Sequence, residues 1–164
     1  MALALALAFS WSIVITPAIA SAWWLVSNNN YDNYDFIDVE QLESTDKTVD
    51  FWSYAFLPKN DKSLKSMKRH KVIDCLNKTY FFKTIVLYSK DGSINAGPSE
   101  GIVQDIVPDT IGDAELKFVC APASTRPNFG EQMEISPETY VSLIRATAPR
   151  SPKLDAPRRR HYQR

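Results

Sequence analysis

The chain has 164 residues, 45% of them hydrophobic, and its 19 basic and 19 acidic side chains give a formal net charge of zero. Five glycines in the whole chain argue against a glycine-rich phosphate-binding loop, and the sequence contains no G-x-S-x-G, H-E-x-x-H or Walker pattern. The sequence therefore gives no reason to expect an enzyme or a cofactor.

Residues 1–22, MALALALAFSWSIVITPAIASA, are uncharged and mostly apolar, and they end in small residues. This pattern is typical of a signal peptide that is cleaved on export, either after Ala22 or after Ala20. An uncleaved membrane anchor is the alternative, because residues 2–26 are long enough to span a bilayer. No cysteine follows the small residues, which argues against a lipoprotein. We expect an exported protein, periplasmic, secreted or on the cell surface, that contacts a membrane only through an uncleaved leader.

The rest of the chain, about 140 residues, has the size of one domain and begins with signals for short strands. Apolar runs at 23–26 and 34–39 are separated by SNNNYDN, whose Asn and Asp side chains favour turns. Residues 48–56 alternate, and one face of this strand carries Trp52, Tyr54 and Phe56. Val49, Phe51 and Ala55 take the other face. The apolar run 79–88 leads into Asp91-Gly92, a hairpin signal, and a further strand is expected at 101–107. These strands predict an antiparallel sheet.

The segment PDTIGDAELKFVCAP predicts a short helix. Asp109 or Thr110 can cap its first turn, Asp113 suits the positive end of the helix dipole, and Pro122 ends it. Cys120 then lies in the last turn.

The two cysteines, Cys75 and Cys120, are expected to form a disulfide, because an exported protein matures in an oxidising compartment. The alternative, a redox-active or metal-binding thiol, finds no C-x-x-C motif and only two histidines in the chain. With Cys75 on a strand, the disulfide links the helix to one face of the sheet. We therefore predict an α+β fold.

Counting by twos from Cys75, with no bulge or turn intervening, places Phe81, Ile85 and Leu87 on the face that carries the helix. The opposite face then receives Tyr80, Phe82, Val86 and Tyr88. The aromatic residues of this face form a candidate binding surface: Trp52, Tyr54, Phe56, Tyr80, Phe82 and Tyr88. Such a patch is seldom left open, so we expect either a homodimer through this face or an intramolecular cover.

The intramolecular cover is a second helix predicted in SPETYVSLIRAT. Ser136 can cap it and Pro137 suits its first position. One side of this helix carries Tyr140, Leu143, Ile144 and Thr147. It lies in an extension at residues 123–149, which is followed by a basic tail at 150–164 whose charged, proline-rich composition predicts disorder.

A basic cluster precedes Cys75 and is the second candidate binding surface. Its members are Lys62, Lys65, Lys68, Arg69, His70 and Lys71. They could attract an anionic partner such as lipid headgroups or polysaccharide. The alternative is a solvated loop that leads into an edge strand, where lysines prevent unwanted strand pairing.

Neither a metal site nor a nucleic-acid partner is expected. Asp32, Asp35 and Asp38 do not have the spacing of an EF-hand loop. The basic tail could bind nucleic acid, but an exported protein seldom meets that partner.

Three segments between residues 23 and 122 resemble, in their order and in their strand and helix cysteines, the surface-adhesin protein E family of Gram-negative envelope proteins. They are YDFIDVEQLESTDKTVDFWSY, SLKSMKRHKVIDCLNKTYFFKTIVLYSKDGS and VPDTIGDAELKFVC. The resemblance implies an antiparallel sheet of about six strands with a helix tethered across it by the disulfide. It also implies proteins that dimerise through their sheets and bind host extracellular-matrix proteins.

We therefore expect a non-enzymatic, adhesin-like binding domain of the bacterial envelope at residues 23–122, with an extracellular-matrix or envelope protein as its partner. The alternatives are a structural or assembly component of the envelope and an unrecognised enzyme.

Overall fold

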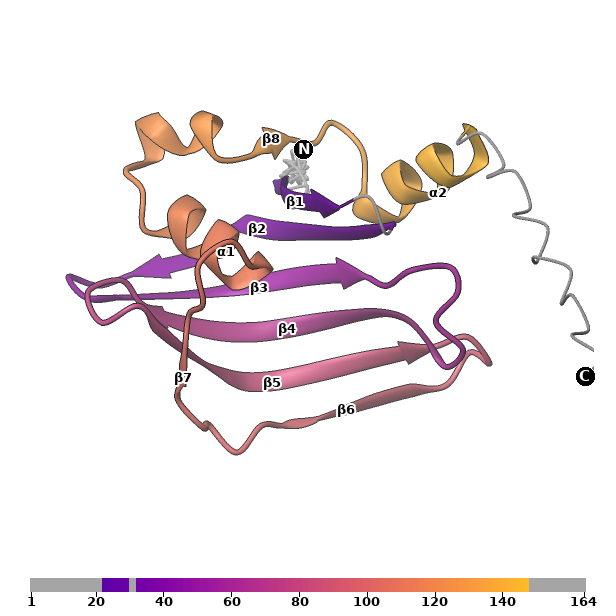
Figure 1. Ribbon diagram of the computed structural model, residues 1–164, viewed down its shortest axis with the longest axis horizontal. Helices are drawn as coiled ribbons and strands as arrows, with labels where there is room; N and C mark the ends of the chain where they lie inside the picture. Colours follow the sequence, from indigo (N-terminus) through magenta and orange to yellow (C-terminus); the bar gives the residue numbers. More distant parts are fainter. Residues whose placement is uncertain (1–21, 30–31, 148–164) are drawn as a thin grey trace, which may run out of the picture.

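The computed structural model describes residues 22–29 and 32–147, in which one antiparallel sheet is the main element (Figure 1). The strand order is β6-β5-β4-β3-β2-β1-β8, and β7 pairs with β5. The strands are β1 (Trp23–Asn29), β2 (Asn33–Ser44), β3 (Thr48–Phe56), β4 (Leu64–Asp74), β5 (Thr79–Ser89), β6 (Ile94–Pro98), β7 (Gln104–Asp105) and β8 (Glu131–Gln132). The predicted antiparallel α+β fold is confirmed. The sheet has eight strands rather than about six, because it includes two very short strands, β7 and β8, of two residues each.

Turn chemistry sets the boundaries at the β5–β6 hairpin. Gly92 has φ +89°, and Asp91 accepts hydrogen bonds from the backbone and hydroxyl of Ser93. The expected hairpin therefore forms, but its second strand is β6. Of the strand predicted at 101–107, only the two residues of β7 are observed as a strand. They pair with Thr79 and Tyr80 at the start of β5.

Three helical segments lie in the C-terminal part of the described chain: α1 (Ile111–Val119), the 3-10 helix η1 (Ala123–Asn128) and, after β8, α2 (Pro137–Thr147). Thr110 caps α1, since its hydroxyl accepts a hydrogen bond from the amide of Asp113. Ser136 accepts the equivalent bond from Thr139 at the start of α2. Local capping signals thus position both helices.

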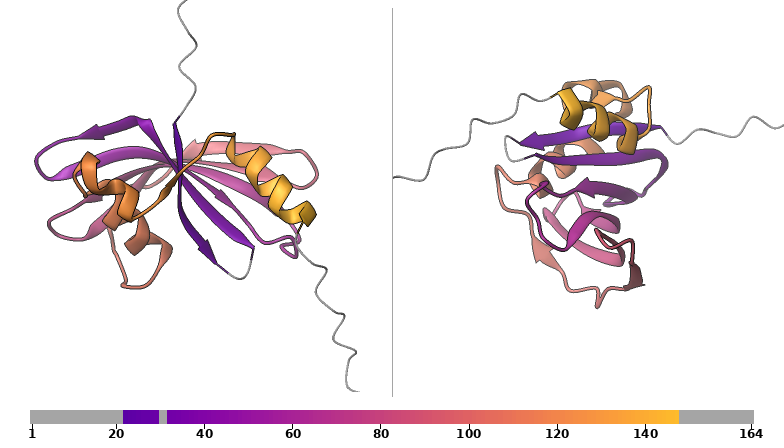
Figure 2. Two further views of the ribbon diagram at one scale, coloured as in Figure 1. Left: turned by 90° about the horizontal axis from the view of Figure 1, so that it is seen from above. Right: turned by 90° about the vertical axis from the view of Figure 1, so that its right-hand side faces the viewer.

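The two α-helices cover opposite faces of the twisted sheet (Figure 2). On the α1 face, Ile37, Phe51 and Ile73 form a core with Leu116, Phe118 and Val119 of the helix. On the α2 face, Phe36, Tyr54 and Phe56 pack with Val141. Alternation along each strand sends neighbouring residues to these two separate cores.

Two irregularities change the predicted faces of β5. A turn separates Cys75 from the strand, and Tyr80 pairs with Ile73 on the α1 face. Phe82 pairs with Lys71, whereas the next pair joins Thr84 to His70, so Lys83 is an extra residue in a bulge. The predicted placement of Tyr80 and Phe82 opposite the helix is therefore wrong, as is that of Phe81, which pairs with Val72. After the bulge, the residues of β5 return to the predicted faces. Ile85 and Leu87 lie on the α1 face, and Val86 and Tyr88 lie on the α2 face.

The second helix packs through a different stripe from the predicted one. Pro137 and Val141 are buried and Tyr140 is half-buried, whereas Leu143 is 53% exposed. The side of α2 that contacts the sheet is thus centred on Val141, one residue from the predicted Tyr140. Leu143 points away from the sheet.

The predicted signal peptide at 1–22, apart from Ala22, and the basic tail at 150–164 lie outside the described residues. Within the described ranges, no helix is long and apolar enough to cross a membrane.

Candidate functional site

The basic cluster is divided between the two faces of the sheet. It lies mainly on β4, which pairs with β3 and β5 and is a central strand, so the predicted loop leading into an edge strand is wrong. Period-two alternation sends Lys68 and His70 to the α2 face and Arg69 and Lys71 to the α1 face. Lys71 is only 3% exposed. The cluster therefore does not form one continuous cationic patch.

On the α2 face, a row of side chains crosses the sheet from β1 to β5. Backbone pairing places Trp23, Asp38, Trp52, His70 and Thr84 side by side on successive strands. The Trp52 and His70 rings stack with centroids 4.8 Å apart and planes 13° from parallel. Nε2 of His70 lies 2.5 Å from Oδ1 of Asp50, a charge-assisted geometry when the imidazole is protonated. Cross-strand contacts thus fix the orientation of these half-buried rings.

The neighbouring row contains Tyr54 and Lys68. Nζ of Lys68 lies 4.9 Å from the Tyr54 ring centroid and 5.8 Å from that of Trp23, within the range of cation–π contacts. The Tyr54 hydroxyl lies 3.3 Å from the Ser66 hydroxyl. Burial raises the pKa of Tyr54 to about 12. Tyr54 is thus part of the core beneath α2 and not an open contact residue.

The six predicted aromatic contact residues have three different environments. Tyr54 and Phe56 are buried in the core under α2, and Tyr80 and Phe82 are on the α1 face. Trp52 and Tyr88 are half-buried on the α2 face. We call five half-buried residues of this face that do not belong to the α2 core the open strip. The open strip consists of Trp52, Lys68, His70, Thr84 and Val86.

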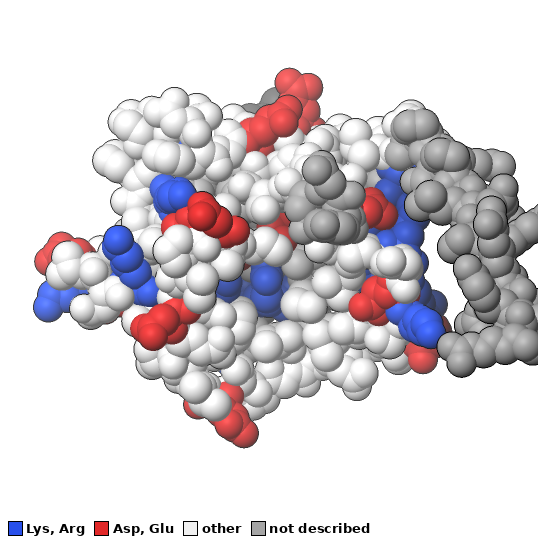
Figure 3. All heavy atoms as spheres, in the orientation of Figure 1, with Lys and Arg blue, Asp and Glu red and all other residues white. Residues whose placement is uncertain are grey.

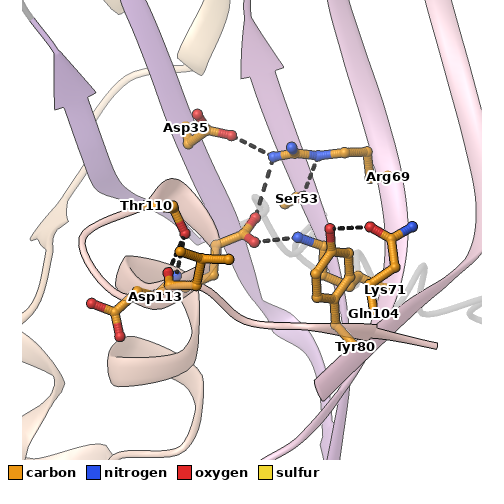
Figure 4. A network of polar contacts seen from close by, with 10 residues as sticks. Asp35, Ser53, Arg69, Lys71, Tyr80, Gln104, Thr110 and Asp113 are labelled. Carbon is orange, nitrogen blue, oxygen red and sulfur yellow. Dashed lines mark hydrogen bonds and ion pairs between the residues drawn. The ribbon is translucent and has the colours of Figure 1, made fainter. Parts of the chain in front are cut away.

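The α1 face holds a buried network of charged side chains (Figure 4). Arg69 donates hydrogen bonds to Ser53 at 3.0 Å and to Glu115 at 3.2 Å, and it forms an ion pair with Asp35. Glu115, which is fully buried on α1, also binds Nζ of Lys71. The two cations and two carboxylates compensate one another, as buried charges must.

The environment shifts the pKa values in this network in different directions. Burial raises the pKa of the Asp35 carboxyl, against the opposing effect of Arg69. Burial alone would raise the pKa of Glu115 too, but Lys71 and Arg69 lower it overall. Burial lowers the pKa of Lys71. Glu115 is therefore the carboxylate that holds its charge most firmly, and it is the electrostatic link between α1 and the sheet.

A covalent link joins the same two elements. Cys75, directly after β4, is bonded to Cys120 at the end of α1, with a Cα–Cα distance of 5.8 Å. The predicted disulfide is confirmed. In the described ranges, no three His, Cys, Asp or Glu side chains come together as a possible metal site.

Sequence reasoning missed the residues whose partners are distant in the chain. Arg69 is 34 residues from Asp35 and 46 residues from Glu115, so no short motif joins them. Trp23 was assigned to a strand but not to the binding surface. One signal could have shown that the basic cluster lies on both faces of the sheet. It is the alternation of inward and outward side chains along the strands at 48–56 and 64–74.

The family model described as "Surface-adhesin protein E" matches residues 23–121, which include all strands except β8 and the whole of α1. A comparison with curated proteins finds no match. The α2 helix lies outside the matched residues.

Proposed function

Because this chain belongs to the surface-adhesin protein E family, we propose that it is a non-enzymatic binding domain of the bacterial envelope that contacts a protein partner through the open strip. The family implies an exported or cell-surface location. The partner is an extracellular-matrix protein or another envelope protein.

One observation carries this proposal: the open strip combines an aromatic ring, a cation and a histidine on one face of the sheet. Trp52 is stacked on His70, and Lys68 is held over Tyr54. Aromatic residues are enriched where proteins bind one another, and a few such anchors supply most of the binding energy. Because cross-strand contacts already order these side chains, little conformational entropy is lost on binding.

The charged groups of the α1 face favour a binding domain over an enzyme. Lys71 and Arg69 are engaged by the carboxylates of Glu115 and Asp35, which gives them a structural task. His70 is on the other face, where it pairs with Asp50. Among the described residues, His70 and the Glu115 network therefore lie on opposite faces and do not meet at one reacting position.

A pull-down with the mature domain, against envelope extracts and against purified matrix proteins, tests the proposal. Trp52→Thr and Lys68→Glu should each weaken capture of the identified partner by about tenfold or more, as expected for anchor residues. Lys62→Glu is the matched control, because Lys62 is exposed in the turn before β4 and outside the open strip. Circular dichroism checks that each variant is folded.

Capture that is unchanged by both strip variants would contradict the proposed surface. Recovery of envelope proteins alone would favour an assembly component over an adhesin. Turnover of a captured small molecule would show an enzyme.

A further inference from the structure

A pocket of about 350 Å3 opens on the α1 face, between β4 and β5 on one side and the start of α1 on the other. Its walls include Tyr80, Phe82, Ile106, Val107 and Ile111, and its floor carries Arg69 and Lys71. Its volume is at the lower end for small-molecule sites. Figure 3 shows Lys and Arg atoms in the middle of this face, with mostly uncharged residues around them.

The two cations retain hydrogen-bonding capacity. An ammonium has three N–H groups, and Lys71 uses one on Glu115 while its Nζ lies 4.7 Å from the Tyr80 ring centroid and 5.1 Å from that of Phe82. Arg69 uses Nε and Nη2, and within the described part of the chain Nη1 makes no hydrogen bond. The pocket therefore combines spare cationic donors with aromatic and aliphatic walls.

We propose that this pocket binds a small organic monocarboxylate whose apolar or aromatic body lies against Tyr80 and Phe82. The carboxylate would accept hydrogen bonds from Lys71 and Arg69, which are strong because both partners are charged. The apolar body would bury surface against the rings and against Ile106 and Ile111.

The charges around the pocket decide between this class of ligand and two others. A cationic ligand would lie beside Lys71 and Arg69, and the ring faces already hold the Lys71 ammonium. A dianion such as phosphate would meet the carboxylates of Glu115 and Asp105, the second of which is part of the pocket wall. A single negative charge is repelled less by these carboxylates than a double one, and an apolar body suits the apolar walls. This site is on the opposite side of the sheet from the open strip, so it does not depend on the proposed function.

Sodium benzoate is the probe, and benzamide and benzylammonium are the comparators of similar shape. NMR spectra of the mature protein should show saturable shifts in the low-millimolar range, centred on Tyr80, Phe82 and Ile111. Benzamide and benzylammonium should bind at least about tenfold more weakly, since they lack the carboxylate. Equal binding of either comparator, or no saturable shift at these residues, would overturn the proposal.

A pair of surface variants tests the location without disturbing the buried charges. Val107 is 60% exposed at the mouth of the pocket, and Ile102 is 61% exposed on the other side of β7 and is not part of the wall. Val107→Trp should block the mouth and weaken benzoate binding at least about tenfold, whereas Ile102→Trp should bind as the unmodified protein does. Equal affinities of the two variants would place the benzoate elsewhere and refute the site.

Discussion

The two α-helices cover opposite faces of one sheet, but different interactions attach them. α1 is bonded to the end of β4 by Cys75–Cys120, places Glu115 in a buried charge network and buries Phe118 completely. α2 buries Pro137 and Val141 and packs Tyr140 against Phe36 in a T-shaped pair whose ring centroids are 5.9 Å apart. Its polar anchor is Arg145, which binds Asp32 and the carbonyl oxygen of Leu57 near the surface.

This difference indicates that α1 is part of the core of the domain, whereas α2 is an addition to it. Removing α1 would expose Ile37, Phe51 and Ile73 to water, and it would break the disulfide and the buried ion pairs of Glu115. Removing α2 would expose apolar and aromatic side chains to water without leaving a buried charge unpaired. The family match stops at residue 121, after α1 and before α2, in agreement with this division.

The largest expected effect on the attachment of α1 to the sheet is that of Glu115→Ala. Because the variant leaves two buried cations with one carboxylate between them, the free energy of unfolding should fall by about 4 to 5 kcal/mol, measured by urea denaturation. Lys117→Ala is the control on the same helix, since Lys117 is exposed and pairs only with Asp113 one turn away. It should cost at most about 0.5 kcal/mol. Equal costs for the two variants would refute the importance of the buried network.

Next in size is the loss of the disulfide in Cys75→Ser/Cys120→Ser. The bond closes a loop with a sequence separation of 45, so the entropic model gives about 4 kcal/mol from the unfolded state. Urea denaturation of the double variant, compared with the oxidised protein, measures this. A loss below about 1 kcal/mol would mean that the charge network and the core hold α1 without the covalent link.

The same contrast explains what could be predicted from the sequence. The disulfide and α1 have local signals, a cysteine in each element and a capping threonine, and both were correctly placed. The face of the sheet on which Tyr80 and Phe82 lie depends on a turn and a bulge, and no residue pattern predicted either of them. The charge network joins Asp35, Arg69 and Glu115 across three elements, and only the tertiary fold brings them together.

The helix α2 illustrates a smaller error of the same kind. Its start at Ser136 and Pro137 followed from capping preferences, but its contact stripe was predicted one residue away from Val141. Periodicity along a short helix with few apolar residues allows more than one stripe, and only the aromatic face beneath it selects Val141.

The smallest expected effect on stability belongs to the removal of α2 by truncation after Ile135. The free energy of unfolding should fall by about 2 kcal/mol, roughly the value of burying Val141 and part of Tyr140, and the sheet should stay folded. Within full-length protein, Val141→Ala should account for much of this loss, whereas Leu143→Ala, exposed on the same helix, should cost little. Urea denaturation of the three variants measures these costs.

The truncation should also change the association state, because it uncovers Phe36, Tyr54 and Phe56 beside the open strip. A contiguous aromatic face of this kind is seldom stable in water, and two copies can bury it by packing face to face in the manner of a β-sandwich. Sedimentation velocity should therefore find a monomer for the full mature chain and a dimer for the truncated one. Deletion of residues 148–164 alone is the control, since it removes the basic tail and keeps α2. A monomer in every form would contradict pairing through this face, and a dimer of the full mature chain would show that α2 does not prevent association.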